Sequence, residues 1–454
     1  MERERAPQLA RHRLAGSKRI SQTAMTGRTD GTPNLRGWAT GIARGDRTQT
    51  LVVWLTIILI YRQALAAPIR AYVPVFWYVP DLLLAVGFMA LLVSGLRRRV
   101  LAVFGFVAVI GILICYSLLT NSLTAVAFSV RGLGYIFLAF FAGIGLRRDD
   151  KRLPVALAGA AALAIIGVYY DYLFTVPWAN TLFVGALKTS DTALQWWSSG
   201  GVRRLSGFGI ASTDTAAQIA AGTMVYFGMT GNRLRLSSII FCAASIHALI
   251  LTTQKATAGW LVIITIAAYA APLLAFRMRG FQASALLKVL GATGLLGCIL
   301  VPPTLSGLGM GGVLGVNAPT LDQRTMEVWP QVLPMVLKFP EFILGYGLGA
   351  IGQTSTLSNL VIVDNMFLFT ALNVGVPLAL LLFAIAGIAL IKTQVRDGAD
   401  FSALAIVALL CLNGITANIV VAGATGSIFL GYAIGCLLRP TRRRTASASR
   451  SAEA

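Results

Sequence analysis

The dipeptide Asp364-Asn365 stands at the start of an apolar run, in the stretch VIVDNMFLFTALNVG. A short side chain with an acceptor oxygen can cap a helix there, because it accepts a backbone N–H bond and complements the helix dipole. A carboxylate in the same place can instead act as a general base that takes a proton from an attacking hydroxyl group. A third role is binding of an acceptor molecule. The residues alone leave these three roles open for Asp364.

Basic side chains are the second group that could do chemistry. Arginine matches phosphate oxygens with two parallel hydrogen bonds, and lysine adds a compact positive charge. An anionic polysaccharide or a lipid diphosphate would therefore suit several such cations gathered at one membrane face. The candidates for phosphate binding are Arg204, Arg324 and Lys255, followed by Arg131 and Arg203.

Other basic residues have simpler interpretations. Arg62 and Arg70 flank a short loop, where a long side chain can anchor a helix at the membrane interface. Arg131 lies inside an apolar run, where a charge is costly and usually faces a polar cavity. Asp81 lies at a comparable depth in another apolar run, so a structural Arg131–Asp81 ion pair remains an alternative to ligand binding.

The composition places these residues in a membrane protein. Of the 454 residues, 56% are hydrophobic and 12% are charged, whereas a soluble domain carries about 25% charged residues. Apolar stretches of about 17–25 residues are typical of transmembrane helices. We predict an all-α polytopic protein with about 12 such helices, at 51–68, 74–96, 100–119, 123–146, 153–174, 211–230, 236–254, 256–276, 284–303, 365–391, 401–417 and 424–438.

The positions of Lys and Arg predict the orientation of these helices. With the N-terminus in the cytoplasm, every basic cluster falls on the cytoplasmic side, as the positive-inside rule requires. We therefore expect both termini to be cytoplasmic, and the loops 175–210 and 304–362 to be periplasmic. The basic tails 1–50 and 439–454 are expected to be disordered around the catalytic domain 51–438, and their charge, part of a net +21, reflects topology rather than nucleic-acid binding.

No resident cofactor is expected. All five cysteines fall in apolar runs and are expected to be buried thiols. The sequence contains no Cys/His cluster with zinc-ligand spacing and no Asp-x-Asp motif, so no metal site is predicted.

Three stretches, taken in order, resemble a known family. They are RRLSGFGIASTDTAAQIAAG at 203–222, LTTQKATAGWL at 251–261, and DQRTMEVWPQVLPMVLKFPEFILGYGLGAIG followed by VDNMFLFTALNVGVPLALLLF. Together they are similar to the bacterial O-antigen polymerase and O-antigen ligase superfamily of Wzy-type membrane glycosyltransferases. The residues that carry the resemblance are Arg324, Trp329, Gly345, Gly347, Gly349, Asp364, Asn365 and Gly375.

The resemblance implies a polysaccharide polymerase in the bacterial inner membrane. Its donor would be an undecaprenyl-diphosphate-linked oligosaccharide. Its other partners would be the growing polysaccharide, membrane lipids and chain-length or export proteins. Asp364 and Arg324 would be catalytic, and the ligase branch usually has His where this chain has Asp364, which favours the polymerase branch. The residues expected to bind substrate are Arg203, Arg204, Lys255, Arg131, Trp329, Asn365 and Gly347.

Three other functions are compatible with a polytopic helical chain. A ligase would move a finished glycan to another acceptor on the same fold. A 12-helix transporter or flippase would place charges near the midplane, often between two related halves. A purely structural scaffold would explain neither the two long loops nor their arginines. The charges here cluster at one predicted face, which favours a glycan transferase.

Overall fold

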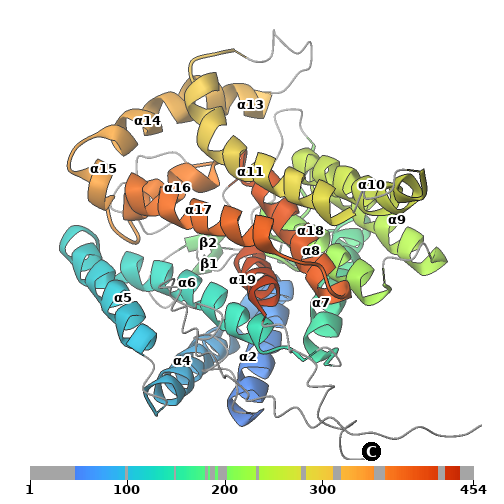
Figure 1. The fold of residues 1–454 in the computed structure, drawn as a ribbon, viewed down its shortest axis with the longest axis horizontal. Coiled ribbons are helices and arrows are strands. Elements are labelled where there is room, and N and C mark those ends of the chain that lie inside the picture. Colours follow the sequence, from blue (N-terminus) through green and yellow to red (C-terminus); the bar gives the residue numbers. More distant parts are fainter. Residues whose placement is uncertain are drawn as a thin grey trace, which may run out of the picture. The chain divides into compact units, whose positions relative to one another are not determined.

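The computed structural model is drawn in Figure 1, and it describes most of the chain outside the two tails. The described residues are 46–97, 101–147, 150–178, 182–184, 190–192, 202–231, 235–277, 283–309, 319–351, 363–417 and 425–439. Most of both predicted tails, and parts of both predicted periplasmic loops, therefore lie outside the described residues.

The described chain is almost entirely helical. Its first half contains α2 (Asp46–Ala64), α3 (Ala66–Tyr72), the short 3-10 helix η1 (Pro74–Trp77), α4 (Val79–Arg97), α5 (Leu101–Thr120), α6 (Leu123–Ile144), α7 (Arg152–Phe174) and α8 (Ser212–Met229). Its second half contains α9 (Leu236–Leu251), α10 (Lys255–Arg277), α11 (Ala283–Leu305), α13 (Pro319–Gln323), the π-helical turn η2 (Arg324–Val328), α14 (Trp329–Leu337), α15 (Glu341–Leu344), α16 (Met366–Val374), α17 (Val376–Lys392), α18 (Gly398–Asn413) and α19 (Thr425–Leu438). The strands β1 (Leu182–Val184) and β2 (Ser190–Thr192) form one antiparallel pair.

Each predicted span overlaps a helix, but the length and apolarity of these helices differ. Four are long and apolar enough to cross a membrane: Pro74–Val93, Leu123–Ile144, Arg152–Phe174 and Ser284–Leu305. A fifth span results if Arg47–Ala64 and Ala66–Tyr72, which meet at 77°, are counted as one bent helix. Where side chains are described, the other apolar helical stretches are shorter: Ala108–Thr120, Leu236–Leu251, Lys255–Ala268, Val376–Lys392, Gly398–Asn413 and Thr425–Leu438. Membrane association is thus supported, whereas the count of about 12 spans stays a prediction.

One predicted span is in fact two helices. The segment 365–391 breaks at Gly375, which separates α16 from α17 and has a φ of +83°. A Cβ atom at this position would lie 2.0 Å from the carbonyl oxygen of Ile343 in α15. Glycine is therefore required both by the left-handed backbone and by this close approach. Apolarity alone could not reveal the break.

The core of the described chain is built around α18 and α19. From Asp400 to Asn413 every residue of α18 is buried, and this helix packs against α8, α10, α11 and α19 (Figure 1). The helix α19 packs against α6 through Gly431 and Gly435. A Cβ atom on Gly435 would lie 2.2 Å from the Phe140 carbonyl oxygen. Small residues spaced by four thus let two helices approach closely, as they do in membrane bundles.

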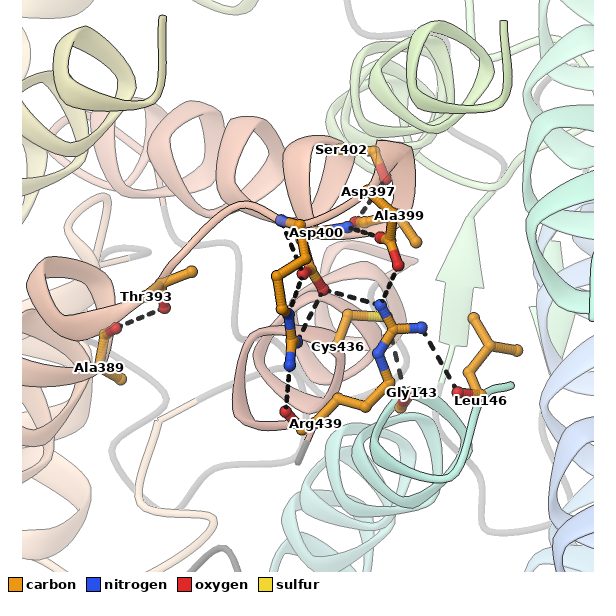
Figure 2. Close-up of polar contacts among 11 residues, drawn as sticks. Gly143, Leu146, Ala389, Thr393, Asp397, Ala399, Asp400, Ser402, Cys436 and Arg439 are labelled. Atoms are coloured by element: carbon orange, nitrogen blue, oxygen red, sulfur yellow. Dashed lines mark hydrogen bonds and ion pairs between the residues drawn. The ribbon is translucent and has the colours of Figure 1, made fainter. Parts of the chain in front are cut away.

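A buried ion cluster holds the start of α18 (Figure 2). Asp400 is fully buried and accepts hydrogen bonds from Arg396 Nε at 2.6 Å and Arg439 Nη2 at 2.9 Å. Arg439 also donates to Asp397 Oδ2 at 2.6 Å, and Asp397 caps α18 by accepting from the Asp400 N–H. A further bond of 3.5 Å joins Arg439 to the Leu146 carbonyl just beyond α6. The buried ion cluster therefore ties together α18, α19 and the end of α6.

Candidate functional site

The candidate site is centred on Asp364 and Arg324, which lie 40 positions apart in the sequence. Arg324 Nε donates a hydrogen bond to Asp364 Oδ2 at 3.0 Å. The Arg324 side chain is 23% exposed and the Asp364 side chain is 32% exposed. Within the described part of the chain, no residue accepts a hydrogen bond from the terminal nitrogens Nη1 and Nη2 of Arg324. The pair is thus formed by one edge of the guanidinium group, and the other edge remains available.

Arg324 is positioned by an unusual backbone turn. It is the first residue of η2, a single π-helical turn between α13 and α14. Next to it, the buried Thr325 accepts a hydrogen bond of 2.7 Å from the N–H of Gly307, beyond the end of α11. Turns of this kind are rare in helices and occur frequently at functional sites. The turn therefore fixes the start of the Arg324 side chain on a rigid support.

The helix cap belongs to Asn365 and not to Asp364. Asn365 Oδ1 accepts a hydrogen bond of 2.9 Å from the N–H of Leu368 in the first turn of α16. Its Nδ2 donates at 3.0 Å to the carbonyl of Ile415, which follows α18. The side chain is fully buried, so the predicted substrate contact of Asn365 would require it to give up one of these bonds. Asp364 is free of the capping role.

The surroundings of Asp364 act on its carboxyl group in opposite directions. Burial raises the pKa of Asp364, while the positive charges of Arg324 and Arg204 lower it. The net result is a pKa above the ordinary value of 3.8. Such a carboxylate is a better proton acceptor than an ordinary surface Asp, because basicity increases with pKa.

The neighbours Arg203 and Arg204 have different partners. Arg203 forms an ion pair with the buried Asp171 of α7 and donates to Thr175 Oγ1 at 3.2 Å. Asp171 also accepts from the N–H of Gly207, so Arg203 helps to fix this loop. The buried Nε atoms of both arginines lack an acceptor, but among the described residues Arg204 forms no ion pair within 4 Å. Arg204 is therefore the better placed of the two to meet a ligand.

Arg131 belongs to a separate ion cluster. Its Nη1 lies 3.4 Å from Asp81, which also pairs with Arg62 at 2.7 Å and accepts from Tyr135 at 2.8 Å. The Arg131–Asp81 pair considered from the sequence is thus present. Arg62 is buried, and its guanidinium group lies 4.5 Å from the ring of Trp77. The prediction that Arg62 anchors at the membrane interface is wrong, because the side chain turns inward to Asp81.

Gly347 and Trp329 are both buried. Gly347 has a φ of +84°, and a Cβ there would come within 3.0 Å of Asn121 at the end of α5. The Asn121 side chain donates to the Tyr346 carbonyl at 2.8 Å, and the Leu348 N–H donates to Ser117 at 2.7 Å. The ring of Trp329 is fully buried. Either residue can touch a ligand only if its surroundings move.

Lys255 is exposed at the first residue of α10. It forms no ion pair within the described ranges, so its ammonium group is free to bind an anion. Of the cysteines, four are buried as expected, but Cys115 is exposed on α5. No group of three or more His, Cys, Asp or Glu side chains gathers in the described residues.

Two groups of structural residues were not predicted from the sequence: Asp171 and the polar end of α5. Asp171 lies in the apolar stretch VYYDYLF of α7. An ionisable residue inside such a stretch indicates a polar partner within the helix bundle. The polar end of α5, with Tyr116, Ser117, Thr120 and Asn121, holds the glycine loop 345–349. No local pattern in the sequence indicates that α5 and this loop meet.

Comparison with known proteins gives no match: no family model, no curated protein and no solved structure matches the chain.

Proposed function

We propose that the protein is a membrane glycosyltransferase that joins lipid-diphosphate-linked oligosaccharide repeats into a polysaccharide at the periplasmic face of the bacterial inner membrane. The observation that carries the proposal is the incomplete pairing of the Arg324 guanidinium group. One edge of its guanidinium group is fixed by Asp364, and the opposite edge has no partner in the described part of the chain. A bidentate oxyanion such as a phosphate is the natural ligand for that edge.

The reaction makes two demands on the site. An acceptor hydroxyl oxygen attacks the anomeric carbon of the donor sugar, and the bond from that carbon to the lipid diphosphate oxygen breaks. The hydroxyl proton passes to a base, and the leaving diphosphate gains negative charge. A base and pre-placed cations are therefore required together.

The residues of the site suit these two tasks. Arg324 and Arg204 would bind the leaving diphosphate, because both retain unused donors. The Lys255 ammonium group is exposed and would add a further charge. Asp364 would accept the proton, since its raised pKa makes its carboxylate a stronger base. A single displacement of this kind inverts the anomeric configuration.

The proposal is tested by removing one cation at a time. In cells that depend on this chain for polymer, Arg324→Ala or Arg204→Ala should abolish polymer while lipid-linked single repeats accumulate. One preorganised donor is worth about 10²–10³ in rate. Arg324→Lys should rescue only part of the activity, because the planar fork is lost.

The matched control is Arg152→Ala, since Arg152 is an exposed arginine paired with Asp150 away from the site. It should leave polymer unchanged. Normal polymer from well-expressed Arg324→Ala and Arg204→Ala proteins would show that these arginines are ordinary loop residues, and the proposed function would lose its support.

A further inference from the structure

A small cavity lies where four helix ends meet. These are the first turns of α8, α10 and α19 and the end of α18. Its polar side chains are Thr213, Asp214, Gln254, Thr257 and Asn413, and its remaining lining residues are Ala217, Ala417 and Gly426. Neither the cavity nor Asp214 has a task in the mechanism proposed above.

The cavity has room for one small group. Its volume is about 20 Å³, and a water molecule needs at least about 10–15 Å³. A single hydroxyl group therefore fits, whereas a sugar ring or a phosphate does not. A ring would have to stay at the mouth and insert only one substituent.

The side chains around the cavity differ in how far their hydrogen-bonding capacity is used. Thr257 Oγ1 donates to Asn413 Oδ1 at 3.1 Å, and Gln254 Nε2 donates to Ser212 Oγ at 3.3 Å. Asp214 is half-buried, and within the described ranges its carboxylate has neither an ion pair nor a hydrogen bond. An ionised carboxylate only accepts hydrogen bonds. In its ionised form, Asp214 can therefore be satisfied only by a donor.

A bound cation fits this arrangement less well than a hydroxyl group. Ca²⁺ takes six to eight oxygen ligands and Mg²⁺ usually keeps several bound waters, whereas this cavity has room for about one water molecule. Here Asp214 is the one carboxylate in the lining, and the amide oxygen of Asn413 is already occupied by Thr257. A hydroxyl group needs only one good acceptor, and Asp214 provides it.

Both segments of the candidate site are hydrogen-bonded to elements that line this cavity. The turn that follows Asn413 accepts hydrogen bonds from the loop of Asp364: Met366 N–H donates to Gly414 at 2.9 Å, and Asn365 Nδ2 donates to Ile415 at 3.0 Å. On the other side, Thr215 Oγ1 donates at 2.9 Å to the Ser206 carbonyl, two residues beyond Arg204. Hydrogen bonds thus connect the segments that carry Asp364 and Arg204 to α8 and to the turn after α18, the elements that provide Asp214 and Asn413 to the cavity.

We propose that Asp214 binds a non-reacting hydroxyl group of the acceptor sugar and thereby orients that sugar toward Asp364. This inference rests on the proposed function for the identity of the acceptor. It makes Asp214 a binding residue that helps to select the acceptor, distinct from Asp364, which takes the proton of the reacting hydroxyl group.

Replacing a ligand-binding residue and replacing a structural residue change the stability of the unliganded protein in opposite directions. A half-buried carboxylate without a partner is costly in the unliganded protein. Its place in the first turn of α8 offsets part of that cost through the helix dipole, by an amount smaller than the burial penalty. Replacing Asp214 should therefore preserve or raise the melting temperature while weakening sugar binding. Loss of a hydrogen bond to a charged group corresponds to about 10- to 100-fold weaker binding.

The experiment uses the full chain purified in detergent and the free oligosaccharide of one repeat unit, released by mild acid from the lipid-linked pool. Thermal unfolding is followed at increasing oligosaccharide concentration, because a ligand that binds the folded state raises the melting temperature. The variants are Asp214→Ala and Asp214→Asn, with Asp150→Asn as the control for loss of an acid away from the site.

We expect the oligosaccharide to stabilise the wild type and the Asp150→Asn protein equally. The Asp214→Ala variant should need about 10- to 100-fold more sugar, with Asp214→Asn in between because it keeps an acceptor oxygen. In polymerisation assays the Asp214 variants should show a raised KM for the acceptor and little change in kcat.

Three results would overturn the inference: no stabilisation of the wild type by the oligosaccharide, equal stabilisation of the Asp214→Ala variant, or a fall in melting temperature of both Asp214 variants without sugar. Stabilisation by sodium chloride but not by choline chloride, lost with Asp214, would show a cation site instead. If the wild type binds the oligosaccharide through Asp214 but never forms polymer, the proposed function fails and the binding site stands.

Discussion

Charged residues lie near both ends of α18, but they are fully paired at one end and incompletely paired at the other. At its start, the buried ion cluster gives Asp400 two arginine partners and leaves it fully buried (Figure 2). Near its end, Arg324 uses one edge of its guanidinium group, and neither Arg204 nor Asp214 has an ion-pair partner among the described residues. Charges that satisfy one another stabilise the protein, whereas incompletely paired charges keep their capacity to bind a ligand. This contrast distinguishes the structural cluster from the candidate site more clearly than residue type does.

The strongest test of the contrast is Asp400→Asn. Removing one partner of a buried ion pair leaves uncompensated charge and costs about 3–5 kcal/mol of unfolding free energy. We expect much lower thermal stability in detergent, with the activity per folded molecule retained. The control Asp150→Asn changes a charge at an exposed pair and should alter stability little. A stable Asp400→Asn protein would show that the buried ion cluster is not what holds α18.

The second test is Asp364→Asn, which should do the reverse. Asn cannot take up a proton as a carboxylate does, and loss of positioned proton transfer costs about 10²–10⁴-fold in rate. Stability should change little, because the carboxyl is partly exposed. Polymer formed from purified lipid-linked repeat is measured at matched protein level and melting temperature. Near-normal turnover would remove Asp364 from the role of base.

A smaller effect is expected for Asn365→Ala. The loss of an N-cap side chain typically costs about 1 kcal/mol, and here a second bond to Ile415 is lost as well. We expect a lower melting temperature and only a modest fall in rate, because the cap orients the loop without touching the reacting atoms. A rate loss as deep as that of Asp364→Asn, at intact stability, would place Asn365 in direct contact with substrate.

The smallest effect concerns pH. Because the pKa of Asp364 is raised in the folded state, its contribution to stability is present below its unfolded pKa and is lost as pH rises through the folded pKa. The difference in unfolding free energy between wild type and Asp364→Asn should fall from about pH 4 upward. The transfer rate should rise over the same window as the base ionises. A transfer rate that is flat from pH 4 to pH 8 would separate Asp364 from proton transfer.

Much of the helical framework follows from the sequence because it depends on local composition. Apolar runs of sufficient length form helices wherever their backbone groups must bond internally, and the predicted segments coincide with helices for that reason. The pairing of Asp81 with Arg131 was also within reach of the sequence, since two charges at similar depth in apolar runs have few other partners. The break at Gly375 was not, because glycine alone does not say which carbonyl will approach it.

The roles of individual polar residues were decided by the tertiary structure. The sequence identified Asp364-Asn365 as a candidate helix cap and a candidate base. Only the tertiary structure, in which Asn365 also bonds to the turn after α18, shows that Asn365 is the cap. Adjacent Arg203 and Arg204 are indistinguishable by type, and they separate because Asp171 lies within reach of one alone. The sequence determined where helices form and which charges are available, since both are local properties. Which charges are satisfied depends on contacts between residues far apart in the chain, and these exist only once the helices have packed.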